Sequence, residues 1–133
     1  MDPFAIQFGR DVTQKYAAKI NFVQKNIFKF LTEEKYDLIW SAGLFDYFSD
    51  EIFIKLLRRF KSWGKPGSYI VIGNFNENYN PSRTTMELLG NWSLTHRTEA
   101  QLTDIAIKAG FNRAAISVGR EEQNVNLFLT IRL

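Results

Sequence analysis

Hydrophobic residues recur along this chain at helical and strand spacings in alternation. In the first segment they stand three or four positions apart, which predicts a helix over residues 3–18. The apolar residues of this helix are Ala5, Phe8, Val12 and Tyr16. A short apolar run then predicts a strand over residues 20–23, and residues 26–32 are typical of a short helix or turn.

The middle of the chain predicts two longer strands separated by an amphipathic helix. Residues 36–40 form the first of these strands, which ends at the small residues 41–43. The helix begins after Ser49 and ends before Gly64. Its apolar stripe consists of Ile52, Phe53, Leu56, Leu57 and Phe60. Residues 69–72 are nearly all apolar, as in a parallel strand that is covered on both faces.

The end of the chain predicts two more helices, the first capped by Asn80 and begun by Pro81, and a β-hairpin. Thr98 and Gln101 match a capping box, so a helix is expected from there to Gly110. Residues 113–119 and 124–132 predict two strands, and the short polar loop between them favours antiparallel pairing. Since helices and strands alternate before this hairpin, we expect a largely parallel sheet with helices on both faces.

Composition narrows the class of protein. The 133 residues correspond to about one domain, and 45% of them are hydrophobic. The net charge is only +3, and the basic residues form no concentrated stripe along the sequence. We therefore expect no nucleic-acid partner. Because the chain has no cysteine, it has no disulfide, cysteine-bound metal or thiol nucleophile. We expect no membrane span, a cytoplasmic location, no metal site and no phosphate-binding glycine loop.

Ligands of parallel sheets bind at the carboxyl ends of the strands, so the polar residues there are candidates for function. Asn26 follows the first predicted strand and could bind a heterocyclic base, although capping the next turn explains it equally well. Gly43 follows the second strand and would let a ligand lie against the backbone. Asp46 could accept a proton or bind an ammonium group, or it could bond backbone N–H groups of its own turn.

Further candidates follow the predicted strand at residues 69–72. The chain has asparagines at positions 74, 76, 78 and 80, and this number favours a polar site over a simple turn-rich loop. His96 is the only histidine and a candidate general base, with the structural role as the alternative. Arg97 could clamp a carboxylate through two parallel hydrogen bonds, or it could form a surface ion pair.

Two segments carry a resemblance to a known family. Residues 36–47, YDLIWSAGLFDY, resemble the fourth-strand motif of class I S-adenosylmethionine-dependent methyltransferases. Residues 65–75, KPGSYIVIGNF, resemble the turn and fifth strand of the same family. Residues 80–83, 86–87 and 92–98 are similar to a bacterial subfamily, the extracellular-factor methyltransferases, which are linked to formation of 3-hydroxypalmitate methyl ester.

The resemblance covers essentially the whole chain and implies a fold. That fold is α/β, a Rossmann-like methyltransferase three-layer sandwich with a mainly parallel sheet and a C-terminal antiparallel β-hairpin. It would be incomplete, because the chain has no glycine-rich turn and would begin after strands 1 and 2 of the family. Residues 1–133 would then be a single partial methyltransferase domain.

The resemblance also implies roles for individual residues, with S-adenosylmethionine as the cofactor and a small molecule as the methyl acceptor. The expected cofactor-binding residues are Asp2, Asn26, Ile27, Ser41, Ala42 and Gly43. The expected substrate-binding residues are Asn74, Asn76 and Arg97. A fatty-acid carboxylate is already ionised and needs no base, whereas a hydroxyl or amine acceptor would need one, and His96 and Asp46 are then the catalytic candidates.

The missing strands would leave unpaired sheet edges. The family's strand order of 3-2-1-4-5-7-6 would place a gap between the strand at 20–23 and the strand at 36–40. Open edges are templates for pairing with another chain, so strand 20–23 should either pair with the next strand or join an oligomer. The alternative to an enzyme is therefore a non-catalytic α/β module that acts through oligomerisation or a protein partner.

Overall fold

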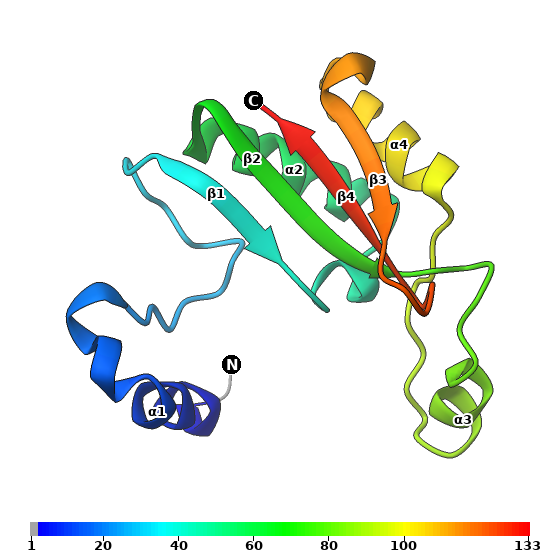
Figure 1. Ribbon diagram of the computed structural model, residues 1–133, viewed down its shortest axis with the longest axis horizontal. Helices are drawn as coiled ribbons and strands as arrows, with labels where there is room; N and C mark the ends of the chain where they lie inside the picture. The colour runs from blue at the N-terminus through cyan, green and yellow to red at the C-terminus, as the bar shows by residue number, and fades with distance from the viewer. Residues whose placement is uncertain (1–2) are drawn as a thin grey trace. The chain divides into compact units, whose positions relative to one another are not determined.

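The computed structural model describes residues 3–133 (Figure 1). The chain divides into two compact units, the first running to Thr32 and the second spanning Glu33–Leu133. Asp2, expected to bind the cofactor, lies outside the described residues. The candidates from Ser41 onward all belong to the second unit.

The first unit consists of two short helices and irregular backbone. Helix α1 (Pro3–Val12) and the 3-10 helix η1 (Gln14–Lys19) replace the single helix predicted over 3–18. The break falls at Thr13, whose hydroxyl donates to the carbonyl of Gly9 at 2.7 Å. Neither helix contains a buried residue. The predicted strand at 20–23 is wrong: these residues are irregular and pair with no strand within residues 3–133, and an isolated strand cannot satisfy its backbone groups.

The second unit is built on a four-stranded sheet in the order β1-β2-β4-β3 (Figure 1). Its strands are β1 (Tyr36–Ser41), β2 (Gly64–Phe75), β3 (Ile116–Arg120) and β4 (Asn126–Arg132). β1 and β2 are parallel, whereas β4 is antiparallel to both β2 and β3. The predicted hairpin is confirmed, and without a strand at 20–23 the parallel part of the sheet is confined to β1 and β2.

β2 is longer than the sequence pattern predicts. The residues expected to form a turn, 65–67, are part of the strand, which pairs from Tyr36↔Gly64 onward. The register between β1 and β2 shifts after this pair, so the extra residues form a bulge. Gly67 has a φ of 82° in this bulge, a conformation that glycine adopts without strain.

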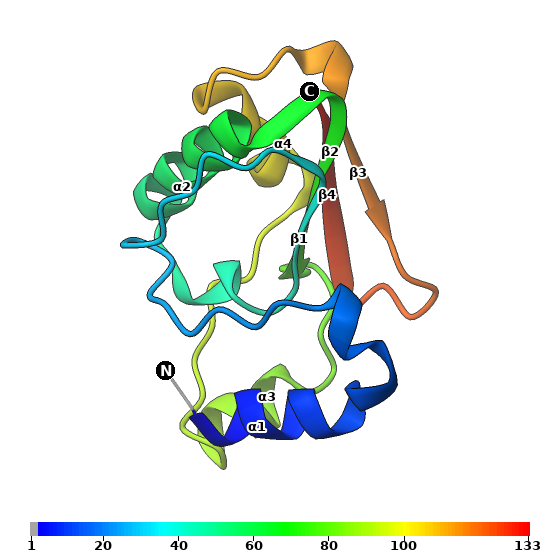
Figure 2. The ribbon, with the colours of Figure 1, turned by 90° about the vertical axis from the view of Figure 1, so that its left-hand side faces the viewer.

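Helices α2 (Asp50–Trp63) and α4 (Glu99–Lys108) cover one face of the sheet, as Figure 2 shows edge-on. The capping box of α4 is present: the Gln101 N–H bonds the Thr98 hydroxyl, and the Gln101 side chain accepts the Thr98 N–H. The core between sheet and helices includes Phe45, Phe53, Leu56, Leu57, Ile70, Ile72, Leu102, Ile105, Leu127, Leu129 and Ile131. The short elements η2 (Phe45–Tyr47), α3 (Arg83–Leu88) and η3 (Arg113–Ala115) lie in the connections.

The other face of the sheet is partly open. Leu38 and Trp40 of β1 are 55% and 57% exposed, and Tyr69 of β2 is 44% exposed. Trp40 stacks on Phe128 of β4, with ring centroids 5.8 Å apart. Within residues 3–133, β1 pairs with a strand on one side only, which leaves its outer edge open. None of the described helices is long and apolar enough to cross a membrane.

Candidate functional site

The turn that follows β1 is tied to the end of β2 by a buried carboxyl group. Asp46 is 2% exposed, and its Oδ1 accepts the N–H of Phe75 at 2.7 Å. Its backbone carbonyl accepts the N–H of Thr95 at 2.7 Å. Burial raises the pKa of Asp46 above its ordinary value, against the opposing effect of the Phe75 hydrogen bond and the charge of Arg97. Asp46 therefore holds three chain segments together, and its proton affinity is increased.

Arg97 contacts the same turn from inside the fold, and it is 1% exposed. Its Nη1 donates to Asn74 Oδ1 at 2.7 Å and to the carbonyl of Phe45 at 3.2 Å. Its Nη2 donates to the carbonyl of Phe48 at 2.6 Å, and both Nε and Nη2 lie 2.9 Å from Asp50 Oδ1. The five N–H donors of a guanidinium are thus engaged within residues 3–133. In this structure, no donor is left for a substrate carboxylate.

Asn74 and Asn76 also use their side-chain amides within the fold. Asn74 is 1% exposed and donates to the carbonyls of Phe75 and Thr95, both at 3.0 Å, while its oxygen accepts from Arg97. Asn76 is 5% exposed, donates to the carbonyl of Asn124 at 2.9 Å and accepts the N–H of Asn78 at 3.1 Å. Their substrate-binding role stays a prediction, and their visible contacts hold neighbouring segments in place.

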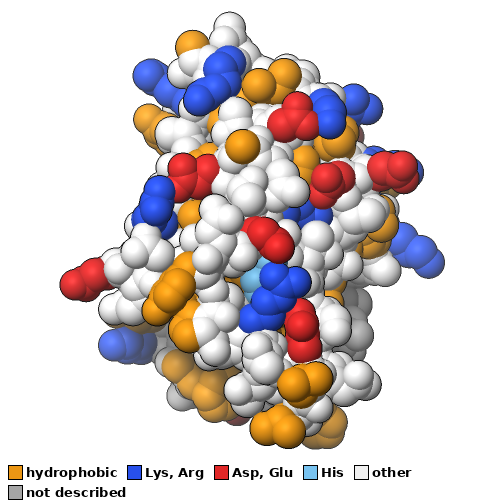
Figure 3. All heavy atoms as spheres, turned by 90° about the vertical axis from the view of Figure 1, so that its right-hand side faces the viewer, with side chains coloured by type: hydrophobic (Ala, Val, Ile, Leu, Met, Phe, Trp, Pro, Cys, Tyr) orange, Lys and Arg blue, Asp and Glu red, His pale blue; other side chains and the backbone are white. Residues whose placement is uncertain are grey.

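His96 has both ring nitrogens engaged. Its Nδ1 lies 3.0 Å from the carbonyl of Leu94, and its Nε2 lies 2.9 Å from Nδ2 of Asn80. Because a carbonyl only accepts and an amide nitrogen only donates, these partners assign the proton to Nδ1. The ring is 6% exposed, and the single histidine is visible only as a small area between charged side chains in Figure 3. As a base, His96 would act through Nε2 after Asn80 moves away.

The segment Ser41–Gly43, expected to border the cofactor, lies at the carboxyl end of β1 and is largely exposed. Gly43 has a φ of 72°, and a Cβ at this position would meet no atom within 4 Å. This backbone is accessible and fits a ligand that lies directly against it. The geometry agrees with the expected role without testing it.

Asn26 and Ile27 belong to the first unit. Oδ1 of Asn26 accepts the N–H of Phe28 at 2.8 Å, which is the turn-capping contact that the sequence left open as an alternative. Ile27 lies in the same turn and is half-buried. Their predicted contact with an adenine ring stays a prediction.

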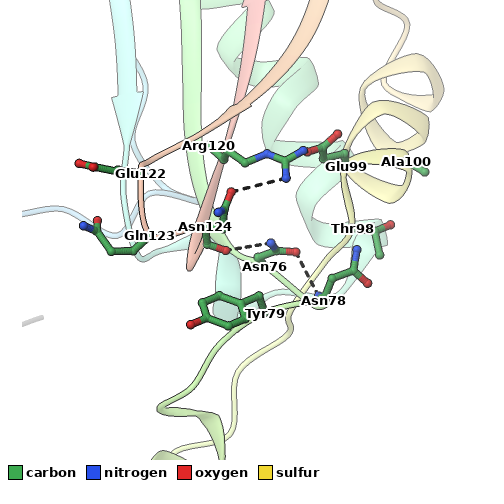
Figure 4. Close-up of a pocket in the computed structure, with 10 residues that line it drawn as sticks. All are labelled: Asn76, Asn78, Tyr79, Thr98, Glu99, Ala100, Arg120, Glu122, Gln123 and Asn124. Atoms are coloured by element: carbon green, nitrogen blue, oxygen red, sulfur yellow. Dashed lines mark hydrogen bonds and ion pairs between the residues drawn. The ribbon is translucent and has the colours of Figure 1, made fainter.

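A hollow of about 850 Å³ opens beside the end of β2 (Figure 4). It is lined by the segment after β2, the start of α4 and the loop between β3 and β4. The lining residues are Asn76, Asn78, Tyr79, Thr98, Glu99, Ala100, Arg120, Glu122, Gln123 and Asn124. Of these, the sequence singled out Asn76 as an expected substrate-binding residue and Asn78 as part of the asparagine-rich segment that favours a polar site. The loop residues were missed because a polar hairpin loop has no signal that separates a binding wall from a solvated turn.

No group of three or more His, Cys, Asp or Glu residues within the described part of the chain is arranged to hold a metal ion. The charged side chains on the face shown in Figure 3 are of both signs and interspersed.

Comparison with solved structures identifies the fold. A possible exported protein from Bordetella parapertussis superposes with a TM-score of 0.79 at 22% identity, over 98% of this chain and 50% of its own. N,N-8-amino-8-demethyl-D-riboflavin dimethyltransferase from Streptomyces davawensis gives 0.76 at 17% identity, over 98% and 40%. Magnesium protoporphyrin IX methyltransferase from Synechocystis, with bound SAH, gives 0.66 at 15% identity, over 96% and 57%.

The second unit and its sheet order thus belong to the fold of class I methyltransferases, in the partial form that the sequence predicted. The chain spans about half the length of the solved structures it matches. No protein-family model matches the chain. No curated protein matches its sequence either.

Proposed function

We propose that this chain is the carboxyl part of an S-adenosylmethionine-dependent methyltransferase that acts on a small-molecule acceptor. The observation that carries the proposal is the superposition on known methyltransferases over nearly the whole chain. The cofactor supplies the methyl group from its sulfonium sulfur to a nucleophile of the acceptor. The chain's own contribution would be the backbone of Ser41–Gly43 at the carboxyl end of β1, where a ligand can approach closely.

The acceptor we propose is a carboxylate, with a fatty acid as the specific candidate from the extracellular-factor resemblance. Because a carboxylate is ionised at neutral pH, this reaction requires no general base. It is compatible with His96 and Asp46, whose polar atoms are engaged within the fold. A hydroxyl or amine acceptor would instead require one of these two groups as a base. A cytoplasmic location and a bacterial origin stay predictions.

A matched pair of glycine variants tests this proposal. Gly43 and Gly67 both have positive φ and both have open space where a Cβ would lie, so alanine causes comparable backbone strain at the two positions. The assay uses the protein encoded by the whole natural reading frame that contains these residues. It measures methyl transfer from labelled S-adenosylmethionine to carboxylate, phenol and amine acceptors. We expect Gly43→Ala to weaken cofactor binding and Gly67→Ala to leave it unchanged. Absence of transfer to every acceptor by the folded wild-type protein would contradict the proposal.

The 133 residues alone should bind the cofactor poorly, because they contain no glycine-rich turn. Calorimetric titration of the isolated chain with S-adenosylmethionine measures this. Micromolar binding would show that such a turn is dispensable.

The alternative, a non-catalytic α/β module, is favoured by one observation. Within residues 3–133, β1 pairs with a strand on one side only and has the exposed side chains of Leu38 and Trp40, an arrangement that promotes pairing with a second copy of the chain. Light scattering should then report a dimer that the variant Trp40→Lys dissociates. A monomer at high concentration would count against this alternative, while the methyl-transfer assay reports on the enzyme separately.

A further inference from the structure

The hollow beside β2 has the size of a small-molecule site. Its volume of about 850 Å³ falls within the range of about 300–1,000 Å³ that is typical of ligand pockets. All of its lining residues lie in the second unit, so the hollow does not depend on how the two units are arranged. It is also separate from Ser41–Gly43, which contributes none of its lining.

Internal hydrogen bonds hold the walls of the hollow in place. The Asn76 side chain bridges the segment after β2 to the β3–β4 loop through the carbonyl of Asn124, as Figure 4 shows. Within that loop, the Glu121 carboxylate accepts the N–H groups of Val125 at 2.7 Å, Asn126 at 2.9 Å and Gln123. The Asn126 hydrogen bond, with the others in support, lowers the pKa of Glu121, and the ionised carboxylate joins the two ends of the loop. The β3–β4 loop therefore forms a wall of the hollow before any ligand binds.

The one cationic side chain of the hollow, Arg120, is already paired. The Arg120 guanidinium forms an ion pair with Glu99, and its Nη1 lies 3.5 Å from Asn124 Oδ1. The other charged lining residue is Glu122, whose side chain points away from this ion pair in Figure 4. An anionic ligand would have to displace Glu99 from Arg120 and would gain no uncompensated positive charge. The lining therefore disfavours phosphate and carboxylate groups.

Apart from Glu122, the side chains of the hollow that keep free hydrogen-bonding groups are uncharged. The side chains of Asn78, Tyr79 and Gln123 line the hollow and make no hydrogen bond within residues 3–133. Tyr79 is 52% exposed and presents a flat ring with a hydroxyl group, and the two amides each offer donors and an acceptor. Asn78 lies on the α4 side of Asn76, and Tyr79 and Gln123 lie on the other side in the view of Figure 4.

We infer that this hollow binds an uncharged molecule that combines a flat ring with several hydroxyl groups. The ring would stack on Tyr79, and the hydroxyl groups would exchange hydrogen bonds with the amides of Asn78 and Gln123. The inference goes beyond methyl transfer, because it uses none of the residues proposed to hold the cofactor.

Three probes with a similar aromatic ring test the inference on the 133-residue chain. 4-Nitrophenyl β-D-glucoside is neutral, 4-nitrophenyl phosphate is anionic and 4-nitrobenzylamine is cationic at neutral pH. Titrations followed by ¹H–¹⁵N NMR should show the glucoside binding about tenfold more tightly than either charged probe, a difference of about 1.4 kcal/mol. The side-chain amide signals of Asn78 and Gln123 should shift with it.

Two tyrosine variants provide the matched control. Tyr79→Leu removes the stacking ring of the hollow, whereas Tyr69→Leu changes a similarly exposed tyrosine on β2 that does not line it. We expect the first variant, but not the second, to weaken glucoside binding about five- to tenfold while the NMR spectrum shows both to be folded. The inference is overturned if the folded chain does not bind the glucoside at millimolar concentrations, if a charged probe binds as tightly, or if both variants weaken binding equally.

Discussion

Two polar regions lie at the same end of the sheet, and they differ in what their side chains do. In the buried cluster of Asp46, Asn74 and Arg97, polar groups bond other parts of the fold. In the hollow beside β2, Arg120 is paired with Glu99, but Asn78, Tyr79 and Gln123 have free hydrogen-bonding groups. A polar residue at a strand end is thus a candidate for binding only if its donors and acceptors are not already used. Substitutions in the cluster should change stability, and substitutions in the hollow should change binding.

The largest effect is expected for Arg97→Met. Removing the guanidinium leaves Asn74 Oδ1 without its donor and removes one hydrogen bond each from the carbonyls of Phe45 and Phe48; the Phe45 carbonyl keeps the N–H of Phe48. An unpaired buried polar group costs about 1–3 kcal/mol, so the free energy of unfolding should fall by about 3 kcal/mol or more. Asp50 adds little, because its side chain is 60% exposed and water can solvate it.

Urea denaturation measures this loss, and Arg83→Met is the matched control. Arg83 forms surface ion pairs with Glu77 and Glu87, and such pairs contribute about 0–1 kcal/mol. Equal losses in the two variants would show that the buried cluster is no more important to the fold than a surface pair.

A smaller effect is expected at Asp46, in two parts. Asp46→Ala leaves the Phe75 N–H without an acceptor and should cost about 2 kcal/mol. Asp46→Asn keeps an acceptor there, and its main effect should be on pH dependence. Since the pKa of Asp46 is raised in the fold, its contribution to stability is complete below the ordinary value of 3.8 and is lost as the pH rises through the folded-state pKa. Denaturation at a series of pH values should show this loss in the wild type and not in Asp46→Asn.

Glu121, in the loop that forms one wall of the hollow, should show the opposite sign. Its pKa is lowered by backbone N–H donors, so its contribution is present above the ordinary value of 4.5 and is lost as the pH falls through the folded-state pKa. Glu121→Gln should lower the melting temperature more at neutral pH than at acidic pH. A uniform decrease at all pH values would mean that the charge of Glu121 does not matter to the loop.

The sequence predicted the sheet and helices of the second unit because their signals are local. The capping box at Thr98 and the apolar run at 69–72 lie within a few residues and need no tertiary contact to be recognised. The strand at 20–23 failed for the opposite reason, since a strand exists only with a partner. The sequence also could not predict the contacts of Arg97, because its partners Phe45, Phe48 and Asp50 lie 47 to 52 residues earlier in the chain.

The smallest effect on stability is expected at Asn78, and it separates the two regions most directly. Asn78 and Asn74 come from the same asparagine-rich segment, yet Asn78 is exposed and Asn74 is 1% exposed. Asn78→Ala should change the free energy of unfolding by less than about 0.5 kcal/mol, because its only contact in this network uses the backbone N–H, which alanine retains. Asn74→Ala removes the acceptor of Arg97 and the donor to Thr95, and should cost about 2 kcal/mol. If the two variants lost equal free energy of unfolding, Asn74 and Asn78 would both be structural residues. The proposed difference between the buried cluster and the hollow would then be wrong.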